Sequence, residues 1–288
     1  MRVLTWNLWW RFGPWDARRK AMLAVLREQR ADVLALQEVW ANGDENLAEW
    51  LAGELGLEHW TWTRFAEPHH WQRRTESDAS DIGVAVLSRW PIGERATVRL
   101  PADGAVDNGR MALYARVESP AGPVPVFTTH LNSAAYDSAT RCAQVRTLHR
   151  FVAEHRGDGA FPPVIAGDFN AWPDSDEMRL MGGYKTAPPV PGQCFVDAWE
   201  YAEPGAPWAT WDATNGYHTP GPSTRIDYVH LGMPGPGGLG AVHGVARFGH
   251  GTVDGVWPSD HAGVRVDLAG AAETAGTAGT AETTETAR

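Results

Sequence analysis

The chain has 288 residues, two cysteines and a formal net charge of -10. This length allows a large buried core, and enzymes of this size are often one domain built on a large sheet. The negative charge argues against non-specific binding of nucleic acid, which needs a basic surface, and two cysteines are too few for a disulfide framework.

The first residues run directly into an apolar, strand-like stretch and lack the apolar region and cleavage site of a signal peptide. No apolar run is long enough to span a bilayer, so we predict no transmembrane segment. We therefore expect a cytoplasmic protein that acts as a monomer, with export by another route left open.

Strand and helix patterns alternate in the first part of the chain and strands dominate afterwards. Residues 2–7 form an apolar strand that ends at Asn7, and a helix with one apolar face follows over 16–30. A β-α-β-α order predicts a sheet with crossover helices, hence an α/β fold. Further strands are predicted over 32–38, 57–64, 82–87, 94–100, 111–118, 123–131, 163–166, 225–230, 241–247 and 262–268, and helices over 44–55 and 138–155.

Three segments lack a regular hydrophobic period. Residues 66–80 are polar and predict a long surface loop, whose His69, His70, Arg73 and Arg74 either face a substrate or are simply solvated. Residues 183–224 hold most of the irregular structure. Residues 269–288 contain no large apolar side chain, which predicts a disordered tail after a catalytic domain over 1–268.

Polar side chains follow the apolar run at 163–166, in the sequence Gly167-Asp168-Phe169-Asn170. We expect Gly167 to let the backbone turn, which places Asp168 and Asn170 at the carboxyl end of a strand. Open α/β sheets usually bind ligands at that edge. The same pattern recurs at other predicted strand ends, in Asn7, Glu38, His130, Asp227, Asp260 and His261.

The oxygen-bearing members of this set suit a hard divalent cation. The carboxylates of Glu38 and Asp260 and the amide of Asn7 are the ligand types that Mg²⁺ or Mn²⁺ takes, usually together with several waters. Glu38 ends an apolar strand, where an unpaired carboxylate would be costly, so a cation explains it better. Zinc fits poorly, because Cys/His ligand spacing and an HExxH motif are both missing.

The histidines suit proton transfer, because imidazole titrates near neutral pH. Asp227 could accept a hydrogen bond from one ring nitrogen of His261, which would fix the tautomer and leave the other nitrogen free to act as a base. The chain has no G-x-S-x-G motif, so we expect direct attack by water and no covalent intermediate.

Seven sequence blocks, in order over residues 1–268, resemble the endonuclease/exonuclease/phosphatase (DNase I-like) superfamily. The resemblance implies a four-layer α/β sandwich, two packed mixed sheets flanked by helices, and metal-dependent cleavage of phosphoester bonds. The blocks are Thr5-Trp6-Asn7, Leu36-Gln37-Glu38-Val39, Gly83-Val84-Ala85-Val86-Leu87-Ser88-Arg89, Thr129-His130-Leu131, Gly167-Asp168-Phe169-Asn170, Arg225-Ile226-Asp227-Tyr228 and Ser259-Asp260-His261.

The resemblance also implies a division of roles among the polar residues. Glu38 matches the main Mg²⁺ ligand, with Asn7 and Asp260 close by. Asp168 and Asn170 match the groups that orient the attacking water and a phosphate oxygen.

Other positions resemble the family's proton-handling and phosphate-contacting groups. His261 with Asp227 matches a histidine–aspartate pair that acts as general base or phosphate contact. His130 matches a second histidine, a general acid or transition-state donor, and Arg110 matches a phosphate-contacting arginine. Trp9 stands where some repair-type nucleases carry an acid, which disfavours an abasic-site nuclease.

Together these features predict a phosphodiesterase acting on a nucleic acid end, a nucleotide or a phospholipid head group. Trp71, Trp208 and Trp211 either stack on the substrate or pack in the core. One alternative is a catalytically silent binding domain, which would have lost a metal or histidine position. The other is a secreted sphingomyelinase-like phospholipase, which would need an export signal.

Overall fold

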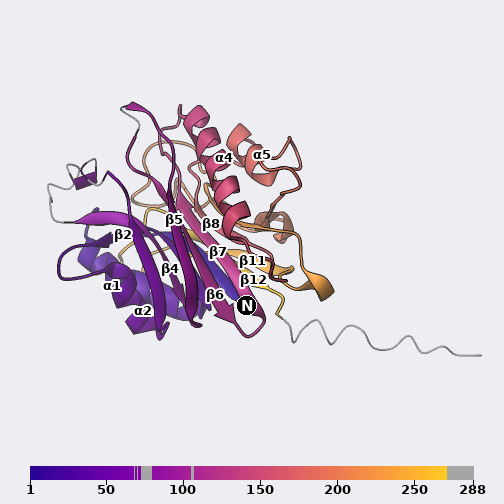
Figure 1. Ribbon diagram of the computed structural model, residues 1–288. Helices are drawn as coiled ribbons and strands as arrows, with labels where there is room; N and C mark the ends of the chain where they lie inside the picture. Colours follow the sequence, from indigo (N-terminus) through magenta and orange to yellow (C-terminus); the bar gives the residue numbers. More distant parts are fainter. Residues whose placement is uncertain (68, 70, 73–79, 105–106, 271–288) are drawn as a thin grey trace, which may run out of the picture.

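The computed structural model describes residues 1–67, 69, 71–72, 80–104 and 107–270 (Figure 1). His70, Arg73, Arg74 and the tail from residue 271 onward lie outside the described residues. Ala269 is buried and pairs with Gly240 and Ala241 through backbone hydrogen bonds, so ordered chain continues past residue 268. No helix in the described part of the chain has the length and apolar character needed to cross a bilayer.

The described strands form two six-stranded mixed sheets that pack face to face. The first sheet has the order β11 (Val242–Phe248), β12 (Gly263–Leu268), β1 (Arg2–Asn7), β2 (Val33–Ala41), β4 (Asp81–Ser88) and β3 (His59–Arg64). The second has the order β5 (Ile92–Arg99), β6 (Met111–Ser119), β7 (Gly122–His130), β8 (Val164–Asp168), β10 (Asp227–Leu231) and β9 (Val196–Asp197).

Helices cover the outer faces of the two sheets. α1 (Trp15–Gln29) and α2 (Leu47–Leu55) lie on one side, and α4 (Ser138–His155) and α5 (Asp176–Gly182) lie on the other (Figure 1). The resulting order of helix, sheet, sheet and helix confirms the predicted four-layer α/β sandwich.

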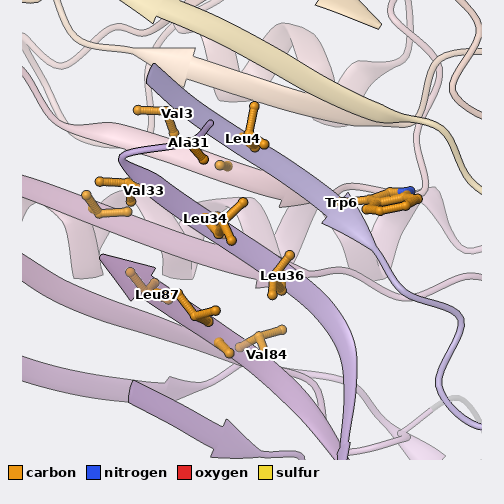
Figure 2. Close-up of a cluster of buried hydrophobic side chains, with 14 of the residues drawn as sticks. Val3, Leu4, Trp6, Ala31, Val33, Leu34, Leu36, Val84 and Leu87 are labelled. Carbon is orange, nitrogen blue, oxygen red and sulfur yellow. The ribbon is translucent and has the colours of Figure 1, made fainter. Parts of the chain in front are cut away.

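Apolar side chains from neighbouring strands fill the interior. Figure 2 shows Val3, Leu34 and Leu87, which come from β1, β2 and β4, within one buried cluster. All nine residues of β2 are buried, as expected for a strand that is covered on both faces. Each fully buried side chain of this kind contributes roughly 1.5–3 kcal/mol, so the sheets form a rigid support for the loops at their ends.

Strand pairing brings the predicted strand ends together. β1 and β2 are parallel, with Asn7 opposite Gln37, and β7 and β8 are parallel, with His130 opposite Asp168. β10 runs antiparallel to β8 and places Asp227 directly opposite Asp168. Side chains that are far apart in the sequence therefore meet at one edge of the sandwich.

Two backbone predictions were wrong. Gly167 does not turn the chain but lies inside β8, where a Cβ atom would collide with the carbonyl oxygen of Thr129 on β7. The left-handed backbone conformation falls instead on Asn170, with φ 49°. Glu38 does not end its strand, because β2 continues to Ala41.

Glu38 occupies a β-bulge, where one strand carries an extra residue. Gln37 pairs with Val84 and Val39 pairs with Gly83, so Glu38 has no opposite residue on β4. Its φ of 51° lies in the left-handed region.

The other predicted strands and helices are present with shifts of a few residues at their ends. The sequence interpretation missed helix α5 and strand β9. Both are too short to show a hydrophobic period, since α5 has seven residues and β9 has two.

Candidate active site

A cavity of about 720 Å³ opens where the two sheets meet. Seven of the nine predicted site residues contribute to its wall, and they come from both sheets. They are Asn7, Glu38, His130, Asp168, Asn170, Asp260 and His261. Asp227 and Arg110 are buried behind the wall.

Asp168 stands at the centre of the polar cluster. Its Oδ2 accepts a hydrogen bond from Asn7 Nδ2 at 3.0 Å and lies 3.2 Å from His130 Nε2 and 3.8 Å from His261 Nε2. Its Oδ1 accepts from the backbone N–H of Asn170 at 2.9 Å. Burial, together with the neighbouring charge of Asp227, raises the pKa of Asp168 to about 7.

His261 is oriented by Asp227. Its Nδ1 lies 2.9 Å from Asp227 Oδ2, so Nδ1–H donates to the carboxylate and Nε2 faces Asp168. Burial alone would lower the pKa of His261, but the carboxylates of Asp227, Asp260 and Asp168 outweigh it and hold the pKa well above its usual value. The ring also meets Trp211 edge-on at 4.9 Å between centroids.

His130 has the opposite electrostatic environment. Burial lowers its pKa well below the usual value, and the positive charges of Arg110 and His261 lower it further. Its Nδ1 lies 4.0 Å from Glu38 Oε1. Two buried imidazoles therefore flank Asp168. The environment of His261 favours its charged form, and the environment of His130 favours its neutral form.

Arg110 stands behind His130. Its guanidinium carbon lies 5.1 Å from the ring centroid of Phe65 and 4.8 Å from that of Trp71, and its Nε donates to Asn108 Oδ1 at 2.9 Å. The structure thus places Arg110 near His130 but does not place it on the cavity wall.

Two sets of side chains could hold a metal ion. Glu38, Asp260 and Asn7 form an oxygen-only set, and burial with the charges of Glu38 and Asp168 raises the pKa of Asp260 to about 7. Buried carboxylates that disfavour each other's ionisation fit a divalent cation, which would compensate their charge. The second set, Asp168, Asp227 and His261, has ligand atoms within 4.8 Å of one another.

The family profile described as "Endonuclease/Exonuclease/phosphatase family" matches residues 4–261, which include every residue of the cluster. The chain belongs to the endonuclease/exonuclease/phosphatase family. The family resemblance inferred from the seven sequence blocks is therefore confirmed.

Two solved structures and one sequence relative are similar to this chain. An endonuclease/exonuclease/phosphatase from Beutenbergia cavernae has 26% identity and a TM-score of 0.69, over 93% of this chain and 71% of that one. The structure of D. rerio TDP2 complexed with single strand DNA product has 20% identity and a TM-score of 0.71, over 92% of this chain and 97% of that one.

The third relative, a Drosophila melanogaster protein named "Putative neutral sphingomyelinase", is 25% identical over 198 residues. The match covers 63% of this chain and 41% of that protein, so the chain spans less than half the length of this relative.

Aromatic side chains form much of the remaining wall of this family member. Trp71 and Trp211, two of the three tryptophans left open by the sequence, line the cavity, whereas Trp208 is 47% exposed and does not. Trp9 and Tyr217 also contribute, with ring centroids 4.5 Å apart. These rings offer flat surfaces next to the carboxylates.

Arg18 supports the site and was missed by the sequence interpretation. It is fully buried and donates to the backbone carbonyl oxygens of Leu8, Trp9, Trp10, Phe12 and Pro258 at 2.8–3.0 Å. These bonds hold the loop after β1 against the segment that leads to Asp260. The signal was available, because Arg18 lies four and seven residues before the apolar Met22 and Val25 on one helix face.

Proposed function

We propose that this chain is a divalent-metal-dependent phosphodiesterase that cleaves its substrate by in-line attack of water. The observation that carries the proposal is the arrangement around Asp168. Its carboxylate contacts Asn7 and both imidazoles in a cavity that also presents Glu38 and Asp260. This supplies metal ligands, a water-orienting acid and two proton-handling groups in one place.

Glu38, Asp260 and Asn7 would hold Mg²⁺ or Mn²⁺. When bound, the ion would neutralise negative charge on the phosphate oxygens and act as a Lewis acid. We prefer this set to Asp168, Asp227 and His261, because His261 and Asp227 already form a hydrogen bond of 2.9 Å that orients the ring.

The remaining groups would manage the water and its proton. Asp168 and Asn170 would orient the attacking water, whose oxygen forms a new bond to phosphorus while the bond from phosphorus to the leaving oxygen breaks. The proton of the water would pass to one of the two imidazoles beside Asp168, and the other would donate a hydrogen bond to a phosphate or leaving oxygen. Asp227 would hold His261 in the required tautomer.

The similar proteins and the cavity wall support a phosphodiester substrate. One relative is named as a sphingomyelinase and one was solved with a single-stranded DNA product, and both names point to phosphodiesters. Trp9, Trp71, Trp211 and Tyr217 would contact a flat or apolar part of the substrate next to the phosphate. A silent binding domain is disfavoured, because each predicted metal and histidine position is occupied by the expected residue.

The proposal is tested with bis-(p-nitrophenyl) phosphate in the presence of Mg²⁺, Mn²⁺ or EDTA. We expect turnover that requires the metal and is lost in Glu38→Gln. Glu54→Gln is the matched control, since Glu54 is an exposed glutamate that pairs with Arg27 on the outer surface. Activity that survives EDTA, or that is equal in the two variants, would rule out the metal mechanism.

A second experiment identifies the natural ester. Phospholipids, oligonucleotides, nucleotides and sugar phosphates are compared as substrates, with His261→Ala as the inactive control. Hydrolysis of sphingomyelin would favour the phospholipase branch, and shortening of an oligonucleotide would favour the nuclease branch. Release of phosphate from monoesters alone would contradict the phosphodiesterase assignment.

A further inference from the structure

A second cavity, of about 280 Å³, lies on the opposite face of the second sheet, beside α5 and β9. Side chains alternate along a strand, so Tyr228 and His230 of β10 face this cavity whereas Asp227 faces the active site. Among the described residues, none lines both cavities. The second cavity is therefore separate from the candidate active site.

His230 is buried in this cavity without a hydrogen bond. It is 3% exposed, and neither ring nitrogen has a hydrogen-bond partner among the described residues. Its ring stacks on that of Tyr228 with 5.4 Å between centroids, and it packs edge-on against Phe169 with 5.3 Å between centroids. Buried polar groups are nearly always hydrogen-bonded, so both nitrogens require a partner that this part of the chain does not supply.

His149 provides an internal comparison. It is also fully buried, and burial lowers the pKa of both histidines to about 4. Both nitrogens of His149 are nevertheless satisfied, since Nε2 lies 3.1 Å from Met181 O and Nδ1 lies 3.0 Å from Gln193 Nε2. The fold thus satisfies one buried histidine completely and leaves the other, on the wall of a cavity, without a hydrogen-bond partner among the described residues.

Arg225, which lines the same cavity, adds a second buried donor without a partner among the described residues. It is 6% exposed and pairs through Nη2 with Asp197 Oδ2 at 2.7 Å, and its guanidinium carbon lies 4.3 Å from the ring of Tyr228. Its Nη1 has no hydrogen-bond partner in the described part of the chain. Lys185 and Arg179 also line the cavity, as do Asp174, Asp197 and Glu200, and Lys185 pairs with Glu200 at 3.5 Å. The basic and acidic side chains of the wall therefore balance, and the unpaired Nη1 of Arg225 carries the argument for an anion.

We propose that this cavity binds a small oxyanion, a carboxylate or a phosphate group, between Arg225 Nη1 and a ring nitrogen of His230. A guanidinium is suited to oxyanions in both charge and geometry, and it disfavours a metal ion. The neutral imidazole supplies one N–H donor and one acceptor, which suits an oxyanion that also carries a hydroxyl. The volume is at the lower limit for ligand cavities, so the ligand is a small molecule and not a polymer.

The direct test uses the wild-type protein in EDTA, with inorganic phosphate and acetate as probes and chloride at matched ionic strength as the control. The readout is the pair of imidazole ¹⁵N signals of His230, identified by their loss in His230→Phe. We expect these signals to move and saturate with phosphate, acetate or both, and not with chloride. A response to only one of the two anions identifies the oxyanion class.

A thermal-shift comparison separates this site from anion binding at the active site. His230→Phe keeps a ring against Tyr228 but removes both unpaired ring nitrogens. We therefore expect the variant to fold and, without anion, to melt at a higher temperature than the wild type. We also expect it to lose the anion-dependent stabilisation contributed by this cavity. His149→Phe is the matched control and should melt lower while keeping that stabilisation. Unmoved His230 signals in the wild type, or unchanged anion stabilisation in His230→Phe, would show that the cavity holds only water and would overturn the proposal.

Discussion

Replacing Arg18 with methionine should destabilise the fold by about 4 kcal/mol. Its five charged-donor hydrogen bonds contribute at least about 1.5 kcal/mol each, roughly 7–8 kcal/mol in all. Burial lowers the pKa of Arg18 from 12.5 to about 10, which at about 1.4 kcal/mol per pH unit is a cost of about 3.5 kcal/mol for keeping the charge. The difference, about 4 kcal/mol, is the loss expected in Arg18→Met.

The free energy of unfolding is measured by urea denaturation with tryptophan fluorescence. Arg27→Met is the matched control, because Arg27 is on the same helix but is half-exposed and, among the described residues, forms an ion pair only with Glu54, at 2.6 Å. We expect a loss of less than about 1 kcal/mol in the control. If Arg18→Met also loses less than about 1 kcal/mol, Arg18 does not hold the loop and the reasoning is refuted.

The pKa of buried His149 is lowered to about 4. As the pH falls from 6.5 to 4, His149 therefore binds a proton in the unfolded chain but not in the native state. The contribution of His149 to stability should be complete above pH 6.5 and fall by about 3 kcal/mol toward pH 4, so urea midpoints should show a weaker pH dependence in His149→Phe than in the wild type. Asp227→Asn should reduce turnover of bis-(p-nitrophenyl) phosphate about 10²–10⁴-fold with unchanged circular dichroism, and near-normal turnover would contradict its orienting role. Gly167→Ala should fail to fold or should unfold at a much lower denaturant concentration, because its methyl group would meet Thr129 on β7.

Local patterns were enough to predict an α/β fold with polar residues at the strand ends, and the resemblance carried by the seven sequence blocks added the family and the four-layer sandwich. Asn7, His130 and Asp168 each end an apolar run, and parallel pairing places such ends side by side. The contact between His261 and Asp227 was anticipated for a different reason, the chemistry of a histidine–aspartate pair and the family resemblance; in the structure Asp227 begins β10, which runs antiparallel to β8. None of this required knowledge of side-chain packing.

Features that depend on three-dimensional packing could not be predicted. Nothing in the neighbouring sequence distinguishes His230, whose ring nitrogens have no hydrogen-bond partner among the described residues, from His149, whose ring nitrogens pair with Met181 and Gln193. The difference arises from what α4 and α5 bring against the outer face of the second sheet. The position of Arg110 behind the wall likewise depends on how Phe65 and Trp71 pack around its guanidinium.

Residues with a strained backbone conformation contribute to the wall of the cavity. Six described residues other than glycine have a positive φ, and three of them, Trp9, Glu38 and Asn170, line the cavity. A non-glycine residue in this region costs on the order of 1 kcal/mol and persists only where its surroundings impose it. At Glu38 the bulge removes the residue from regular pairing with β4, so a strand buried on both faces can carry a carboxylate to its polar edge. The same backbone distortion that weakens the sheet therefore lets Glu38 reach the cavity that also contains Asp260 and His130.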